Sequence, residues 1–171
     1  MGYIAILRNL CYNYDISQNG GAKFMVCTFF GHKDCYGLKT ETLLNAIEGL
    51  VEKDVDTFYV GHQGNFDSMV HSCLKQLKEK YPHISYSIVL AYLPTNTQGY
   101  DPYQGCSVFP EGLETVHPKF AIEKRNKWLI DHAAYCICCI NHTWGGAYKF
   151  ARQAKSRGLT TINLGSAELY N

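Results

Sequence analysis

Short apolar runs alternate with longer segments of mixed polarity along most of this chain of 171 residues. The runs are rich in β-branched and aromatic side chains, which is typical of buried strands. They cover residues 24–30, 57–60, 84–93, 135–140 and 160–164. We therefore expect five strands.

Between the runs lie four segments whose apolar residues recur every three or four positions, the spacing of one helical face. We expect helices at residues 39–53, 66–80, 120–132 and 146–156. Strands that alternate with helices and are almost continuously apolar predict an α/β fold, a Rossmann-like three-layer sandwich with a mainly parallel, doubly wound sheet. In such folds the ligand binds outside the carboxyl ends of the strands, near the point where the strand order reverses.

Two segments interrupt this alternation. Residues 1–22 join a short apolar run to turn-forming Asn, Asp, Ser and Gly, so we interpret them as an N-terminal appendage with an extra strand and turn. Residues 23–171 are then a single domain. Its long loop, at 94–118, contains four of the five prolines, and loops of this length are commonly functional.

Composition narrows the choice of partners and of compartment. Sixteen basic residues against 15 acidic ones leave a net charge of +1, so we expect neither general nucleic-acid binding nor attraction to a membrane. Several of the eight cysteines lie inside apolar runs, including Cys136 and Cys139 on one expected strand, which favours buried thiols over disulfides. We expect a cytoplasmic protein, and a homo-oligomer remains open.

Three expected strands end in glycine-bearing turns, where backbone can approach a ligand and helix amides can bind an anion. The candidate ligand contacts are Gly31, His32 and Lys33 after the first strand, Gly61, Gly64 and Asp67 after the second, and Trp144, Gly145 and Gly146 after the fourth. Each turn also has a purely structural interpretation, and Asp67 could simply complement the helix dipole. The dinucleotide fingerprint and the Walker pattern are absent.

The helix expected at 120–132 places a guanidinium among apolar residues. Arg125 lies three and four positions from Ile122 and Leu129, and therefore on the same face. Because an unpaired buried charge is costly, Arg125 either pairs with internal groups or faces a phosphate or carboxylate ligand. Both interpretations remain open at this stage.

The residues at 28–33, 61–67, 121–128 and 144–147 together resemble the SLOG superfamily, the Rossmann-like group that unites DprA-type proteins with LOG-type nucleotide hydrolases. Within this superfamily they resemble specifically its YpsA-like bacterial branch, and the resemblance spans residues 23–164. The resemblance implies a pocket for a nucleotide or nucleotide derivative, formed by the strand-end loops with Arg125 and Asn126. It implies no required cofactor beyond such a bound nucleotide.

LOG-type enzymes cleave the N-glycosidic bond of nucleoside monophosphates with a helix arginine and a glutamate that follows a Gly-Gly-x-Gly-Thr turn. Arg125 matches the arginine, but Ala151 and Arg152 stand where the acid is expected. Without that carboxylate the transition state lacks its main stabilising group. Our leading hypothesis is therefore the binding or sensing of a nucleotide-derived phosphate ligand. The alternative is a hydrolase with a non-standard acid, chosen from Asp67, Glu123 and Asp131.

A third hypothesis concerns a transition metal. His32, His62 and His142 each follow a strand and would gather at one edge of the sheet, with Asp67 as a fourth ligand. Their spread across loops lacks the tight spacing of metal motifs, so we assign no metal ligand. No catalytic residue is assigned either.

Overall fold

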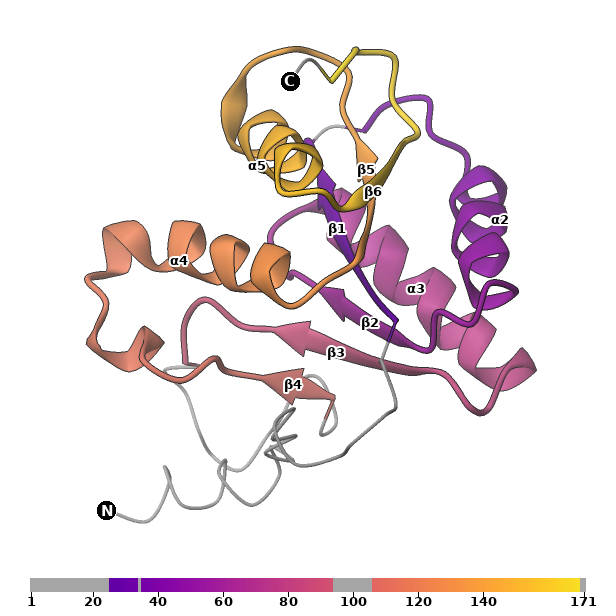
Figure 1. The fold of residues 1–171 in the computed structure, drawn as a ribbon, viewed down its shortest axis with the longest axis horizontal. Coiled ribbons are helices and arrows are strands. Elements are labelled where there is room, and N and C mark those ends of the chain that lie inside the picture. Colours follow the sequence, from indigo (N-terminus) through magenta and orange to yellow (C-terminus); the bar gives the residue numbers. More distant parts are fainter. Residues whose placement is uncertain (1–24, 34, 94–105, 170–171) are drawn as a thin grey trace.

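The computed structural model describes residues 25–33, 35–93 and 106–169. The appendage predicted at 1–22 and part of the predicted loop, at 94–105, lie outside the described residues. One sheet of six parallel strands, in the order β4-β3-β2-β1-β5-β6, forms the centre of the molecule (Figure 1). The strands are β1 (Val26–Gly31), β2 (Thr57–Val60), β3 (Ser85–Val89), β4 (Ser107–Val108), β5 (Tyr135–Cys139) and β6 (Thr160–Asn163).

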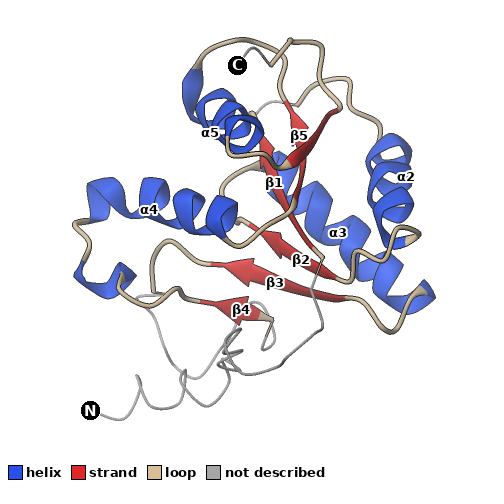
Figure 2. Ribbon diagram, in the orientation of Figure 1, coloured by secondary structure: helices blue, strands red, loops and turns tan. Residues whose placement is uncertain are grey.

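Two pairs of helices cover the two faces of this sheet (Figure 2). On one face lie α2 (Thr40–Val51) and α3 (Asn65–Lys80), and on the other lie α4 (Pro118–Asp131) and α5 (Gly145–Ser156). The prediction of a Rossmann-like three-layer sandwich is thereby confirmed. Each predicted helix is present, with ends that differ by at most two residues from the expected ones. None of the described helices has the length and apolar character that a membrane crossing requires.

Strand β5 shows how the sheet divides the core into two clusters. Ile137 and Cys139 pack with the apolar faces of α2 and α3, whereas Cys136 and Cys138 pack with α4 and α5. All three cysteines of β5 are buried free thiols, as their place in an apolar strand predicts. Cys136 and Cys139 therefore lie on opposite faces and cannot act as a pair.

Part of the predicted loop at 94–118 is regular. Strand β4 pairs with β3, where the amides of Ile88 and Leu90 donate to the carbonyls of Cys106 and Val108 at 2.7 and 2.8 Å. A short 3-10 helix, Leu113–Thr115, follows it. A strand of two residues leaves no apolar pattern of its own, because the hydrogen bonds of its neighbour define it.

The strand order reverses at β1, and this position locates the crevice. The chain proceeds outward from β1 through β2 and β3, and later returns to place β5 on the other side of β1. The loop after β1 leads to α2 on one face, while the loop after β5 leads to α5 on the opposite face. The two loops therefore diverge above the carboxyl ends of β1 and β5, which is where such folds bind ligands.

Candidate functional site

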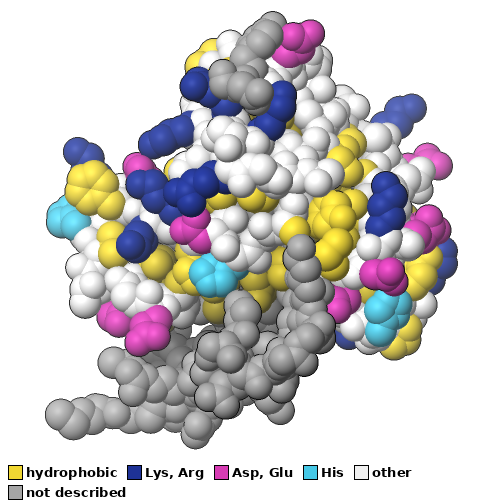
Figure 3. Space-filling view, viewed as in Figure 1, with side chains coloured by type: hydrophobic (Ala, Val, Ile, Leu, Met, Phe, Trp, Pro, Cys, Tyr) yellow, Lys and Arg dark blue, Asp and Glu magenta, His cyan; other side chains and the backbone are white. Residues whose placement is uncertain are grey.

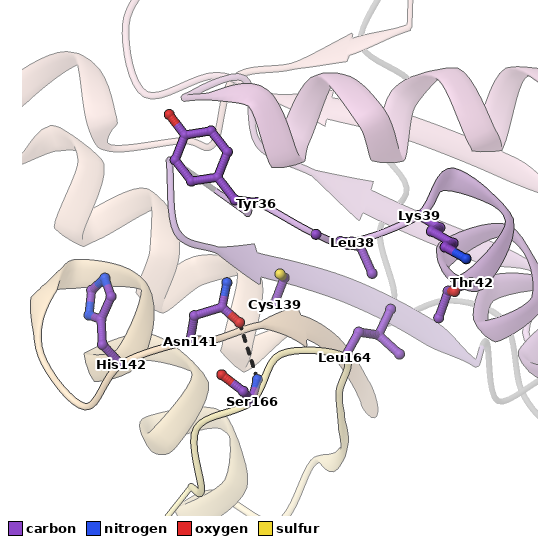
Figure 4. A pocket seen from close by; sticks show the side chains of 10 residues that line it. Tyr36, Leu38, Lys39, Thr42, Cys139, Asn141, His142, Leu164 and Ser166 are labelled. Carbon is purple, nitrogen blue, oxygen red and sulfur yellow. Dashed lines mark hydrogen bonds between the residues drawn. The ribbon is translucent and has the colours of Figure 1, made fainter.

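A cavity of about 890 Å³ lies at this reversal point, between the segment that leads into α2 and the loops that follow β5 and β6 (Figure 4). We call it the switch-point cavity. It is lined by Tyr36, Gly37, Leu38, Lys39, Thr42, Cys139, Asn141, His142, Leu164 and Ser166.

The lining is divided almost equally between polar and apolar groups. Leu38 and Leu164 supply apolar surface, and Lys39 and Thr42 lie at the amino end of α2. Asn141 accepts a hydrogen bond at its Oδ1 from the amide of Ser166 at 3.1 Å, which joins the loops after β5 and β6 (Figure 4). A hollow of mixed polarity with a cation in its lining suits a small anionic ligand.

Three aromatic rings stack beside the cavity. The His32 and His142 rings have centroids 3.5 Å apart, and those of His142 and Trp144 are 3.8 Å apart, with both pairs nearly parallel. His32 is buried at one end, whereas Trp144 is 69% exposed at the other. The exposed face of Trp144 is therefore free to stack on a planar group.

His32 holds the two loops of the reversal point together. Its Nδ1 accepts from the amide of Asn141 at 3.2 Å, so its Nε2 carries the proton and donates to the carbonyl of Trp144, also at 3.2 Å. Burial lowers the pKa of His32 below its ordinary value, although the hydrogen bond to Trp144 opposes this effect. His32 is thus neutral, and its two hydrogen bonds join the loop after β1 to the loop after β5.

The amino end of α5 is open beside this stack. Gly145 has a φ of +90°, which favours glycine, and the position of a Cβ on it lies 4.0 Å from Cε1 of His142. A Cβ on Gly146 would have no atom within 4 Å. Among the described residues no side chain caps this helix at Trp144, so its first amides are available to an anion.

A second group of predicted residues lies at the ends of β2 and β3, and we call it the arginine centre. Arg125 of α4 is 3% exposed, and its Nη1 donates to the carbonyl of Val89 at 3.0 Å. Asp67 of α3 accepts from the amide of Gln63 at 2.7 Å. A Cβ on Gly61 would lie 2.5 Å from Nη1 of Arg125 and 2.6 Å from Oδ2 of Asp67, so both charged groups press against this glycine.

The two charges of the arginine centre influence each other without forming a close ion pair. Within the described part of the chain, no nitrogen of Arg125 lies within 4.0 Å of a carboxylate oxygen, and its Nε has no hydrogen-bond partner. Burial raises the pKa of Asp67 and lowers the pKa of Arg125, while their mutual attraction opposes both shifts. Arg125 is therefore a buried cation that internal groups satisfy only in part.

The other predicted contacts have separate places. A Cβ on Gly31 would overlap the ring of Phe66, so this glycine permits α3 to pack on β1. Lys33 is exposed, and its Cα lies 3.6 Å from the Cβ position of Gly64, so the turns after β1 and β2 touch. Asn126 is half-buried and points about 100° away from Arg125 around the helix.

The three acids considered for hydrolysis, Asp67, Glu123 and Asp131, do not lie at the same place in the structure. Exposed Lys and Arg side chains gather over α4 and α5 (Figure 3), and two of the acids lie among them. Glu123 pairs with Lys127 at 3.1 Å and with Lys149 at 3.3 Å, and Asp131 pairs with Arg157 at 3.0 Å. These are surface ion pairs. Only Asp67 lies beside Arg125.

The metal hypothesis finds no support in this geometry. Both ring nitrogens of His32 are engaged by backbone groups, and its ring stacks on His142. Residues 25–33, 35–93 and 106–169 contain no cluster of three or more side chains that could hold a metal ion.

None of the eleven ligand contacts predicted from the sequence is among the residues that line the switch-point cavity, and His142 of the lining was considered only as a metal ligand. Asn141 directly follows a predicted strand, so the rule that identified His142 could have identified it as well. Tyr36, Lys39 and Ser166 carry no motif, and only the strand order brings them together.

No model of a known protein family matches the chain, and no curated protein sequence matches it either.

Proposed function

We propose that this chain binds or senses a nucleotide, or a nucleotide-derived phosphate ligand, in the switch-point cavity at the carboxyl edge of the sheet. One observation carries the proposal: the cavity lies at the reversal of strand order, with the amino ends of α2 and α5 beside it. The resemblance to the SLOG superfamily implies the same class of ligand.

The cavity and the adjoining amino end of α5 support a specific arrangement of this ligand. Its phosphate would accept hydrogen bonds from the open amides of Gly145 and Gly146, and its base would stack on the exposed ring of Trp144. Lys39 and Asn141 would contact the sugar or a second phosphate inside the cavity.

Binding is favoured over turnover because the cavity lacks the necessary acid. Among the described residues that line it there is no aspartate or glutamate. Cleavage of a glycosidic bond needs a carboxylate to stabilise the transition state or to activate water. A lining of amides, hydroxyl groups and one lysine holds a ligand without supplying that group.

A hydrolase remains the second candidate, and one observation favours it. Burial raises the pKa of Asp67, so this carboxyl retains its proton at higher pH than usual, as a general acid requires. Incubation with a panel of nucleoside monophosphates, followed by chromatography, would reveal a released base. Release that Asp67→Asn abolishes would establish the hydrolase, whereas no release from any nucleotide would remove it.

The binding proposal is tested by one glycine of α5. Because a Cβ on Gly146 meets nothing, Gly146→Asp should fold normally and place a carboxylate where the phosphate is proposed to bind. We expect phosphate-bearing nucleotides to raise the Tm of the wild-type chain, and Gly146→Asp to weaken their binding about tenfold or more. Calorimetric titration measures the affinity directly.

Gly146→Ala is the matched control, because it adds a methyl group without charge. It should retain the thermal shift and the affinity. Equal affinity of the Asp and Ala variants would contradict the proposed phosphate position, and the absence of any shift across a broad nucleotide panel would contradict the function.

A further inference from the structure

Two cysteine thiols meet at the floor of the switch-point cavity. Cys139 ends β5 and lines the cavity, and Figure 4 shows its sulfur directed toward the hollow. Cys35 lies in the segment between β1 and α2. Its Sγ donates to the carbonyl of His32 at 3.1 Å and lies 3.4 Å from the carbonyl of Cys139, which places it directly over that residue.

The two side chains also interact with each other. The neighbouring Cys35 thiol lowers the pKa of Cys139, and Cys139 in turn raises the pKa of Cys35. Burial opposes the effect on Cys139. A thiolate is the reactive form of cysteine, so Cys139 is the better nucleophile and Cys35 is placed to resolve it.

We propose that Cys35 and Cys139 form a redox-active pair, which hydrogen peroxide converts to a disulfide at the floor of the cavity. This inference does not depend on the proposed nucleotide ligand. Cys139 is 1% exposed but lines the cavity, so a small oxidant such as hydrogen peroxide would approach its sulfur from the cavity side.

The chemistry has two steps. The Cys139 thiolate attacks one oxygen of the peroxide, the O–O bond breaks, and the departing hydroxide takes up a proton to become water, which leaves Cys139 as a sulfenic acid. The Cys35 sulfur then attacks the sulfur of Cys139, the S–O bond breaks, and hydroxide leaves with the Cys35 proton as a second water. The two thiols lose two electrons and two protons, and one peroxide becomes two waters.

Cys136 and Cys138 also interact with each other, but among the described cysteines Cys139 alone lines the cavity. Cys136 and Cys138 lie in the cluster on the opposite face of the sheet, and Cys27 and Cys73 are buried in the core. Burial raises the pKa of Cys27 and of Cys73, which makes these thiols less reactive. Cys106 is partly exposed in front of β4, and it serves as an internal control.

Peptide mapping of the full chain under non-reducing conditions tests the proposal. The reduced protein is treated with hydrogen peroxide, remaining thiols are alkylated, and the digest is analysed by mass spectrometry. We expect a crosslinked peptide pair that contains Cys35 and Cys139, lighter by two hydrogen atoms than the sum of its parts and cleaved by dithiothreitol.

Two serine variants distinguish the roles of the thiols. Cys35→Ser should stop at the sulfenic acid, which dimedone traps on Cys139, whereas Cys139→Ser should leave Cys35 no more reactive with dimedone than Cys106. Cys106→Ser should still form the crosslink. The proposal is overturned if both cysteines remain open to alkylation after peroxide treatment, or if Cys106 is oxidised as fast as the pair.

Discussion

The switch-point cavity and the arginine centre lie on the same edge of the sheet, yet they use glycine in opposite ways. In the arginine centre, Gly61 is required because two charged side chains fill the space that a Cβ would take. Beside the cavity, Gly146 borders open space and exposes helix amides. A glycine between a strand and the first turn of the next helix thus marks either tight packing or access, and only its neighbours show which.

The two regions also place their charge differently. Arg125 is a cation inside the protein, held by the carbonyl of Val89 and the attraction of Asp67. Lys39 is an exposed cation at the rim of the cavity. A buried charge that internal groups already contact contributes to the fold, whereas a rim charge is available to a ligand.

Arg125→Met gives the largest expected effect. It leaves the carbonyl of Val89 without this donor and removes the positive charge near Asp67, so the free energy of unfolding should fall by about 3 kcal/mol in urea denaturation. Lys124→Met, at an exposed neighbour on α4, should change it by less than about 0.5 kcal/mol. A small decrease in the free energy of unfolding together with a complete loss of nucleotide binding would show that Arg125 binds the ligand and does not mainly stabilise the fold.

Alanine at the two glycines gives a medium effect of opposite sign. Gly61→Ala forces Arg125 and Asp67 apart and should lower the free energy of unfolding by about 1–3 kcal/mol. Gly146→Ala should raise it by about 0.5 kcal/mol, because alanine favours the helix and meets no neighbour. Thermal denaturation of both variants measures these opposite changes. Equal Tm values for Gly61→Ala and Gly146→Ala would contradict the prediction.

The smallest expected effect is on the pH dependence of the free energy of unfolding. Burial lowers the pKa of His32 in the folded protein below 6.5, its ordinary value, so the native state resists protonation there. The stability that neutral His32 contributes is therefore present above pH 6.5 and is lost as the pH falls through the lower folded pKa. His32→Gln should lose less stability than the wild-type chain between neutral pH and pH 5.

His71→Gln is the control for this titration, because burial lowers the pKa of His71 as well but His71 lies on α3, away from the braced loops. If the free energy of unfolding of His32→Gln and of His71→Gln falls equally on acidification, His32 has no special role in joining the loops.

The periodicity of apolar residues predicted the fold, but the sequence predicted only part of the candidate site. The apolar strands and the striped helices predicted the three layers because burial on both faces of a parallel sheet requires them. Strand β4 was missed, since its two residues are defined by hydrogen bonds from β3. The switch-point cavity was missed as a set of residues because Tyr36 and Ser166 are 130 positions apart in the sequence and meet only after β5 lies beside β1.

The ring column that ends in Trp144 also gives the molecule an intrinsic optical reporter. The chain has two tryptophans, and each indole stacks on an imidazole, Trp144 on His142 at 3.8 Å and Trp128 on His132 at 4.0 Å. The first is 69% exposed beside the cavity, and the second belongs to the helix layer over β2. With Trp128→Phe as background, emission from the remaining indole would follow occupancy of the site without any attached label.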